Sequence, residues 1–271
     1  IHAEQINEAK LQFFINISHE IRTPMSLIIS PLQQLMAKDK DAECRKLYST
    51  IQRNAERILQ LVNQLMDIRK IDKGQMSLMF KKAEIVSFTR DLLETFEQQT
   101  RVKKIDLKFH TSAPEIEMWI DPKNFDKIIL NLLSNACKFT PENGQVEISL
   151  STGEDTHLPQ NAPLRRYVEL TVAVTDDGIG MSQEDVGRIF ERYKRLTQSE
   201  RSTIGTGIGL HLTRSLVELH YGNIHVEDNG EGRPGSRFII RLPLGNEHLK
   251  KEEIEEATTA DTLINIPAAE P

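Results

Sequence analysis

The sequence lacks the features that mark several classes of protein. Its two cysteines, Cys44 and Cys137, lie in segments with helical patterns and without metal-ligand spacing, so reduced thiols are favoured over a disulfide framework or a metal site. It contains neither a signal peptide nor an apolar run of about 18 residues, so no membrane contact is expected from it. A formal net charge of −6 argues against nucleic acid as a partner.

Both ends of the chain bear on where the domains are expected to begin and end. The chain begins at Ile1 without an initiator methionine, which favours a fragment of a longer protein. Residues 246–271 contain seven acidic and two basic side chains, which leaves the rest of the chain nearly neutral. Because this stretch is also poor in aromatic residues, we predict an acidic linker or tail rather than a packed element.

Two N-terminal segments place apolar or small uncharged residues at alternating spacings of three and four, the heptad pattern of packed helices. They are Leu11, Phe14, Ser18, Ile21, Met25, Ile28, Leu32 and Leu35 in the first, and Ile51, Ala55, Ile58, Val62, Leu65 and Ile68 in the second. The polar stretch AKDKDAEC separates them, so residues 1–75 are predicted to form a helical hairpin. Such a hairpin completes its core most simply by pairing with a copy of itself, as a dimeric four-helix bundle.

Residues 76–245 alternate helical and strand patterns, which predicts a mixed α/β domain. The helical patterns cover 84–100, 122–139, 183–192 and 208–221. The strand patterns, rich in β-branched and aromatic residues, cover 105–110, 117–120, 146–150, 167–174, 223–227 and 236–242. The polar residues 151–166 contain prolines between two strands and predict a hairpin loop.

The first candidate for chemistry is His19, in the stretch ISHEIRTP. It lies one position past the seam residue Ser18, so its ring is expected to project from the side of a helix into solvent. An exposed neutral imidazole is a nucleophile near pH 7, although spacing alone fits an ordinary surface histidine as well. Pro24 removes a helical hydrogen bond one turn later, so we expect the helix to be able to bend there.

The second candidate is the stretch NLLSNACKFT, residues 131–140. Asn131, Asn135 and Lys138 stand at i, i+4 and i+7, which puts two amides and an ammonium on one helical face. Amide oxygens can hold a hydrated Mg²⁺ while the lysine contacts a phosphate. The alternative is a polar outer face on an ordinary amphipathic helix.

Two glycine-containing stretches follow. In VTDDGIGM a strand leads to Asp176, which can accept a hydrogen bond from an exocyclic amine such as that of adenine, and to Gly178 and Gly180, which allow close approach of a flat ring. In GTGIGL, residues 205–210, alternating glycines lead into a helix, an arrangement that presents backbone N–H groups to phosphates. Each pattern is weak by itself, and the second is not placed as in a dinucleotide-binding fold.

Between these stretches, residues 189–204 mix aromatic and basic side chains. The segment can form a mobile lid over a nucleotide, with basic residues near the phosphates, or it can be a charged surface loop. The candidate phosphate contacts include Arg192 and Arg195.

In this order, the motifs resemble those of the cytoplasmic core of a sensor histidine kinase of two-component signalling. They are FINISHEIRTPM, Asp121 followed by NLLSNACKFT, DDGIGM, IFERYKR and GTGIGL, and the resemblance covers about residues 11–244. It implies that the α/β domain is a Bergerat or GHKL ATP-binding sandwich, a mixed sheet with helices on one face. It also implies that residues 76–245 bind ATP and that residues 1–75 serve for dimerisation and phosphotransfer.

The resemblance further implies a role for each matching residue. His19 would be autophosphorylated from Mg-ATP, Glu20 would take or orient the proton of its ring, and Thr23 would position a water that dephosphorylates the partner. Asn135 would be the Mg²⁺ ligand. The implied nucleotide-binding set is Asn131, Asn135, Lys138, Phe139, Asp176, Gly178, Gly180, Arg192, Arg195, Gly205, Thr206, Gly207, Gly209 and Leu210.

The resemblance also implies partners. The phosphoryl group would pass to an aspartate of a response regulator receiver domain, and the chain would form a homodimer through the helical hairpin. The acidic stretch after residue 245 favours a hybrid kinase with a receiver domain on the same polypeptide. The parent protein is expected to be anchored in the bacterial inner membrane, with this core in the cytoplasm.

Two other functions are considered. A GHKL-type ATPase that drives conformational change has a glutamate that activates water one turn before the metal-binding asparagine; Asn131 at this position argues against it. A dimerisation module with a decayed nucleotide site is disfavoured because the matching asparagine, aspartate and glycine positions are all occupied.

Overall fold

The computed structural model describes residues 2–175, 183–191, 207–228 and 235–255, and only the backbone of 2–17, 19, 175, 183–185 and 228. These residues fall into two compact parts. One contains the residues up to Met76 together with Gly187–Ser215, and the other contains Ser77–Val186 together with the residues from Leu216 onward. Among the helices of the described residues, none has the length and apolar character needed to cross a membrane.

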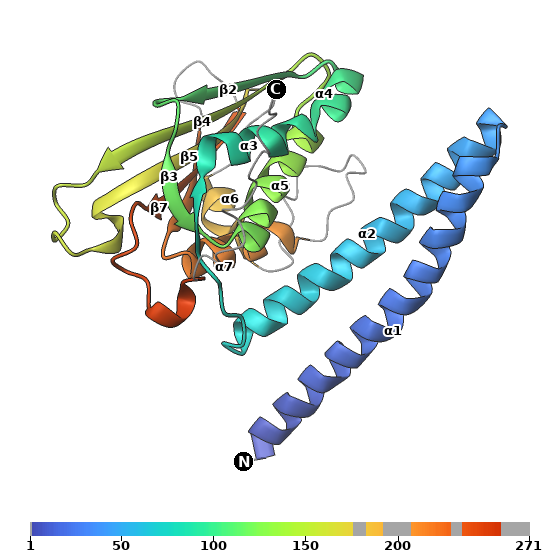
Figure 1. Cartoon of the computed structure of the whole chain (residues 1–271), viewed down its shortest axis with the longest axis horizontal. Helices are drawn as coiled ribbons and strands as arrows, with labels where there is room; N and C mark the ends of the chain where they lie inside the picture. The colour runs from blue at the N-terminus through green and yellow to red at the C-terminus, as the bar shows by residue number, and fades with distance from the viewer. Residues whose placement is uncertain (1, 176–182, 192–206, 229–234, 256–271) are drawn as a thin grey trace, which may run out of the picture. The chain divides into compact units, whose positions relative to one another are not determined.

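The N-terminal residues form a pair of long helices, as the heptad pattern predicts. α1 (His2–Lys38) and α2 (Ala42–Asp72) lie side by side in opposite directions (Figure 1). Asp41 sets the turn between them, since its side chain accepts a hydrogen bond from the Glu43 N–H at 3.0 Å and caps α2. α1 continues as a helix past Pro24. The predicted helical hairpin is therefore confirmed.

The α/β part is built on a mixed sheet. Within the described residues it has five strands in the order β2-β4-β5-β7-β6, of which β2 and β4 are parallel and the other neighbours antiparallel. A separate antiparallel ladder joins β1 to β3. The strands are β1 (Lys81–Glu84), β2 (Asp106–Thr111), β3 (Glu117–Ile120), β4 (Gln145–Glu154), β5 (Arg166–Thr175), β6 (Asn223–Asp228) and β7 (Gly235–Pro243). Every strand predicted from the sequence is present, and β1 is an additional one.

Helices α3 (Ile85–Glu94) and α5 (Pro122–Phe139) lie on one face of this sheet (Figure 1). Their apolar sides and the alternate residues of the central strands form the core, which includes Phe125, Ile128, Leu132, Val146, Ile148, Leu150, Val168, Leu170 and Val172. The remaining helices are α4 (Glu97–Lys103), α6 (Gln183–Arg188) and α7 (Gly209–Leu219), with short 3-10 turns η1 (Pro163–Arg165) and η2 (Lys251–Glu253). The predicted mixed sheet with helices on one face is confirmed.

The single helix predicted over residues 84–100 is wrong. Thr95 ends α3, because its hydroxyl donates to the Leu92 carbonyl at 2.6 Å and its N–H also bonds to that carbonyl. The Phe96 N–H then bonds to the Leu93 carbonyl, so the last turn tightens and the chain starts a second helix, α4. The pattern of hydrophobic residues did not indicate this break, because the break depends on hydrogen bonds from Thr95 to the Leu92 carbonyl and not on the spacing of apolar residues.

The prediction of an unpacked tail is wrong for residues 246–255. The Phe80 N–H donates to the Glu253 carbonyl at 2.7 Å, and the Glu255 N–H donates to the Phe80 carbonyl at 2.9 Å. The Tyr221 hydroxyl contacts both carboxylate oxygens of Glu253, at 2.9 and 3.0 Å. Residues 256–271 lie outside the described residues. The acidic composition was a poor guide here, because Glu253 is used for specific bonds and not only for solvation.

Glu84 connects the β1–β3 ladder to α3. Its carboxylate accepts hydrogen bonds from the N–H groups of Val86 (2.9 Å), Ser87 (2.6 Å) and Ile116 (3.0 Å), and so caps α3. Burial raises the pKa of this carboxyl, but the backbone hydrogen bonds outweigh burial and bring the pKa down from 4.5 to about 2.

We expect Glu84→Gln to remove a pH-dependent contribution to the free energy of unfolding. Because the folded pKa is the lower one, the ionised carboxylate stabilises the fold above the unfolded value of 4.5, and this contribution is lost as the pH falls towards about 2. The variant should lose about 2 kcal/mol of unfolding free energy at neutral pH and should show a weaker pH dependence below about pH 5. Urea titrations over this range measure both, with the exposed Glu117→Gln as control. An unchanged pH slope in Glu84→Gln would contradict this assignment.

Candidate functional site

Helix α5 holds the candidate residues for nucleotide and metal binding. It begins after Asp121, whose side chain accepts a hydrogen bond from the Asn124 N–H at 3.1 Å and whose neighbour Pro122 takes the first helical position. The side of the helix opposite the core contains Asn131, Asn135 and Lys138, which are partly exposed. The structure thus brings the three predicted polar residues onto one helical face.

The C-terminal end of α5 is fixed by a lysine that the sequence patterns did not indicate. The Lys103 ammonium donates to the carbonyls of Cys137 (2.8 Å) and Lys138 (3.2 Å), where the helix leaves carbonyl groups without partners in the helix. No sequence pattern pointed to this role, because Lys103 lies outside the helix predicted over 84–100. Next to this end, Phe139 is 52% exposed, and the Lys138 ammonium lies 4.7 Å from the centre of its ring.

The second glycine stretch leads into a helix, as the sequence predicts. Gly207 has a φ of 67°, a conformation that favours glycine, and α7 begins at Gly209. Leu210 is partly exposed in its first turn. The helix is held by buried side chains further along, among them Leu212 and Leu216. Gly205 and Thr206 lie outside the described residues.

The first glycine stretch and most of the predicted lid lie outside the described residues. β5 runs to Thr175, and the predicted residues Asp176, Gly178 and Gly180 lie outside the described residues. Arg192 and Arg195 also lie outside them. At the start of the lid, Phe190 is buried, and the His211 ring nitrogen Nδ1 lies 3.1 Å from its carbonyl oxygen.

The candidate phosphoacceptor lies on α1. His19 follows the buried Ser18, and its side chain is outside the described residues. Glu20, the next residue, and Thr23, one turn further on, are both exposed. Close to them, the Arg22 guanidinium donates to the Asn63 side-chain oxygen at 2.9 Å and joins α1 to α2. The helix therefore presents the acid and hydroxyl residues of the motif to solvent.

The described residues of α5 fit a nucleotide with Mg²⁺. Amide oxygens are among the oxygen ligands found at hydrated cations, and an ammonium at the same face can contact a phosphate. The exposed Phe139 ring offers an apolar surface beside them. The described part of the chain thus combines an antiparallel helix pair, on which Glu20 and Thr23 are exposed, with a two-layer α/β part whose helix α5 has a polar face.

Comparison with known families shows to which class of protein the chain belongs. Residues 9–74 match the His Kinase A (phospho-acceptor) domain. Residues 120–246 match the family of histidine kinase-, DNA gyrase B-, and HSP90-like ATPases. The chain belongs to the histidine kinases of two-component signalling and contains both domains of their core.

Individual relatives agree with this assignment. Histidine kinase P4 of Formosa agariphila is 34% identical over 93% of the chain, and hybrid signal transduction histidine kinase D of Dictyostelium discoideum is 33% identical over 95%. The chain spans only 18% and 16% of their lengths. Full-length ShkA, solved in complex with AMPPNP, is similar in fold, with a TM-score of 0.65 over 86% of this chain and 46% of that chain at 24% identity.

Proposed function

We propose that the chain is the catalytic core of a sensor histidine kinase, which phosphorylates His19 from Mg-ATP. The phosphoryl group then passes to an aspartate of a receiver domain. The observation that supports this most is the presence, in one chain, of the phosphoacceptor domain and an ATPase-type domain. By the family resemblance, Asn131 stands where the ATP-hydrolysing members have a glutamate that activates water. Without that base, the γ-phosphoryl group is kept for the histidine.

In the proposed reaction a ring nitrogen of His19 attacks the γ-phosphorus in line with the leaving oxygen. The nitrogen–phosphorus bond forms as the bond to the leaving oxygen breaks, and ADP departs with the electron pair. Glu20 takes or orients the proton on the other ring nitrogen. Asn135 and the phosphates would hold Mg²⁺, which neutralises charge on the leaving group.

The remaining nucleotide contacts follow from the same proposal. Asn131 and Lys138 would contact the phosphates from α5, and Asp176 would accept a hydrogen bond from the adenine amine. The glycine stretch before α7 would cover the phosphates through its N–H groups. Thr23 would position a water for removing the phosphoryl group from the partner, so the chain would also act as a phosphatase.

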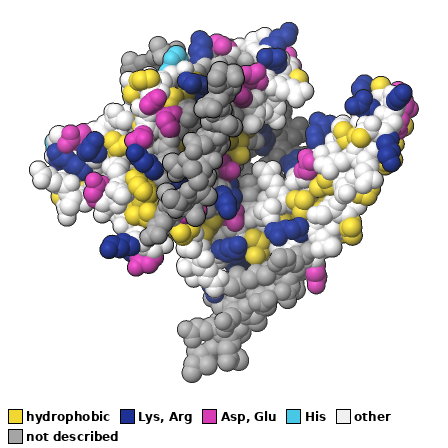
Figure 2. Space-filling model, in the orientation of Figure 1, with side chains coloured by type: hydrophobic (Ala, Val, Ile, Leu, Met, Phe, Trp, Pro, Cys, Tyr) yellow, Lys and Arg dark blue, Asp and Glu magenta, His cyan; other side chains and the backbone are white. Residues whose placement is uncertain are grey.

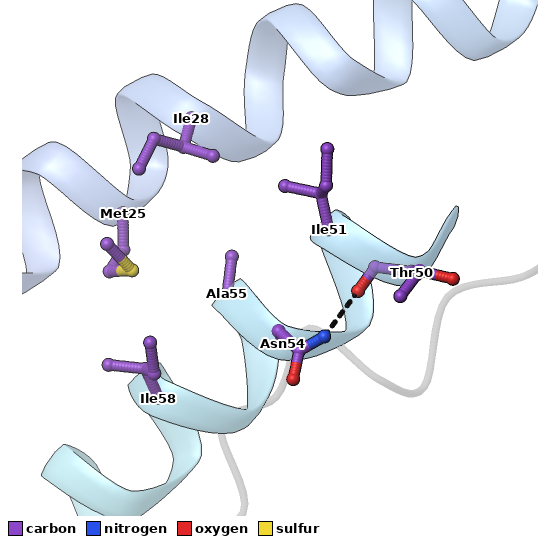
Figure 3. A pocket seen from close by; sticks show the side chains of 7 residues that line it. All are labelled: Met25, Ile28, Thr50, Ile51, Asn54, Ala55 and Ile58. Carbon is purple, nitrogen blue, oxygen red and sulfur yellow. Dashed lines mark hydrogen bonds between the residues drawn. The ribbon is translucent and has the colours of Figure 1, made fainter. Parts of the chain in front are cut away.

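The helix pair leaves an apolar groove that we assign to a second copy of the chain. Ile28, Ile51 and Ile58 are 40%, 48% and 41% exposed, although they belong to the predicted seam. Together with Met25 and Ala55 they line a groove of about 270 Å³ between α1 and α2 (Figure 3). Figure 2 shows hydrophobic side chains exposed along this helix pair. The heptad spacing of these residues on both helices fits the same seam of an identical hairpin, which would close a four-helix bundle.

Ile51→Glu is expected to convert the dimer to a monomer. The substitution would place a carboxylate without a partner in each copy of the dry seam, and this weakens association by about 100-fold or more. Analytical ultracentrifugation at micromolar concentrations measures the change. Gln60→Glu, on an exposed position of α2, should stay dimeric. A monomeric wild-type chain, or a dimer that tolerates Ile51→Glu, would contradict the bundle.

The partner and location of the whole protein are part of the proposal. Residues 1–75 would serve for dimerisation and phosphotransfer, 76–245 for catalysis, and the chain after 245 would lead to further domains. The similarity to a kinase named as hybrid favours a receiver domain on the same polypeptide. We further propose that the parent protein is anchored in the bacterial inner membrane, with this core on the cytoplasmic side.

One assay separates the proposed kinase from the two alternatives. The chain is incubated with γ-labelled ATP and Mg²⁺, and the protein-bound label is treated with acid and with alkali. The kinase predicts a label that is lost in acid and stable in alkali, because the nitrogen–phosphorus bond of phosphohistidine has these properties. Release of phosphate without labelled protein would indicate an ATPase, and the absence of nucleotide binding would indicate a dimerisation module.

A further inference from the structure

Asp121 and His220, which are 99 residues apart in the sequence, are joined by a buried hydrogen bond. The Asp121 N–H lies 3.2 Å from Nε2 of His220, so this nitrogen must accept the bond. The other ring nitrogen, Nδ1, lies 2.8 Å from the Leu216 carbonyl oxygen and therefore bears the proton. His220 is only 2% exposed, so both polar atoms of its ring are paired in a dry environment.

The side chain of Asp121 makes two further bonds. One carboxylate oxygen accepts the Asn124 N–H at 3.1 Å and caps α5, and the other accepts the Met79 N–H at 3.0 Å. The junction thus connects the start of α5, the end of α7 and the segment just after Met76, where the α/β part begins. The His220 ring packs on Phe125 of α5 and on Phe80, with ring centres 6.0 and 5.4 Å apart.

This arrangement fixes α5 at the end remote from its candidate nucleotide residues. α5 begins at Pro122, while Asn131, Asn135 and Lys138 lie in its second half. α7 ends at Leu219, just before His220. A helix transmits a shift or rotation at one end to the other, because its backbone is a rigid hydrogen-bonded rod.

We propose that Asp121 and His220 are positioning residues for ATP binding, which hold the start of α5 in the arrangement in which Asn131, Asn135 and Lys138 bind the nucleotide. The inference rests on the proposed function, because it concerns the nucleotide of that same site. The proposal assigns neither residue a contact with the nucleotide. Loss of the bond between them, or of the Asp121 side-chain bonds to Asn124 and Met79, lowers the population of the binding-competent arrangement and weakens the apparent affinity in proportion.

Two matched substitutions at residue 220 test the junction. The amide of His220→Asn can replace Nδ1 and bond to Leu216, but it is too short to reach Asp121. The longer His220→Gln can place its oxygen where Nε2 accepts the Asp121 N–H. We expect His220→Asn to bind ATP about tenfold more weakly, because a buried N–H loses its partner, and His220→Gln to stay within about twofold of the wild type. The exposed His157→Asn should bind as the wild type does.

Substitutions at Asp121 leave its backbone N–H and the bond to His220 in place, and test the side-chain bonds of the same junction. Asp121→Ser keeps a cap for the Asn124 N–H, whereas Asp121→Ala removes it. We expect ATP affinity to fall about tenfold in Asp121→Ala and by no more than about threefold in Asp121→Ser. Titration calorimetry measures the affinity, and hydrogen exchange of residues 122–129 without nucleotide reports directly on the first turns of α5. Exchange there should be faster in His220→Asn and Asp121→Ala.

The outcomes separate this inference from the proposed function. If the folded variants His220→Asn and Asp121→Ala bind ATP as tightly as the wild type, the positioning role is wrong, while labelling of the wild type would still support the kinase. Equal weakening in His220→Asn and His220→Gln would also overturn it, because the acceptor would then not matter. A wild-type chain that does not bind ATP would overturn both.

Discussion

Replacement of His19 by glutamine should abolish incorporation of the γ-phosphoryl group of ATP into the protein while ATP binding remains intact. Glutamine is polar and favourable in a helix, so α1 and the hairpin should persist. Its side-chain amide nitrogen, unlike an imidazole nitrogen, has no lone pair available for attack on phosphorus. Labelling is therefore expected to fall by about 1,000-fold or more, to the background of the assay.

Two controls make this result specific to His19. His110→Gln changes a histidine on the exposed strand β2 and should label as the wild type does. Calorimetric titration of His19→Gln with ATP should give an unchanged affinity, since nothing in the proposal assigns the nucleotide to α1. Label that persists in His19→Gln would move the phosphoacceptor to another residue.

Replacement of Asn135 by alanine should have the second largest effect on ATP binding and on labelling of the protein. Alanine favours the helix, so α5 should remain folded, but the amide oxygen proposed as the protein ligand of Mg²⁺ is lost. We expect ATP affinity in the presence of Mg²⁺ to fall by about 100-fold and labelling to fall at least as far.

The neighbouring residue supplies the control for this second experiment. Ser134→Ala, an exposed change on the same turn of α5, should alter neither ATP affinity nor labelling. Titrations with ATP in Mg²⁺ and in EDTA should show that Asn135→Ala loses most of the Mg²⁺-dependent part of the affinity. A variant with the wild-type dependence on Mg²⁺ would contradict the metal-binding role of Asn135.

The fold could be predicted from the sequence where periodicity decides it. The bounds predicted for the strand at 117–120 and the helix at 122–139 agree with β3 and α5. Both have strong local signals, since Asp121 and Pro122 mark the helix start and the residues before them are apolar or aromatic. The break at Thr95 and the packing of residues 246–255 were missed because they depend on hydrogen bonds of single polar side chains.

Part of the candidate site could also be predicted from the spacing of residues along a helix. The i, i+4, i+7 spacing of Asn131, Asn135 and Lys138 was sufficient to place them on one face of α5. The contacts of Lys103 with the Cys137 carbonyl and of His220 with Asp121 join residues 34 and 99 positions apart. No local pattern encodes such pairs, because they form only when the whole layer packs.

The central claim is that His19 receives the phosphoryl group of ATP. The most direct measurement is tandem mass spectrometry of the wild-type chain after incubation with ATP and Mg²⁺, with digestion and separation at neutral to alkaline pH so that phosphohistidine survives. The proposal predicts a single phosphorylated site at His19. Phosphate on a different residue, or release of ADP and phosphate with an unmodified His19, would contradict it.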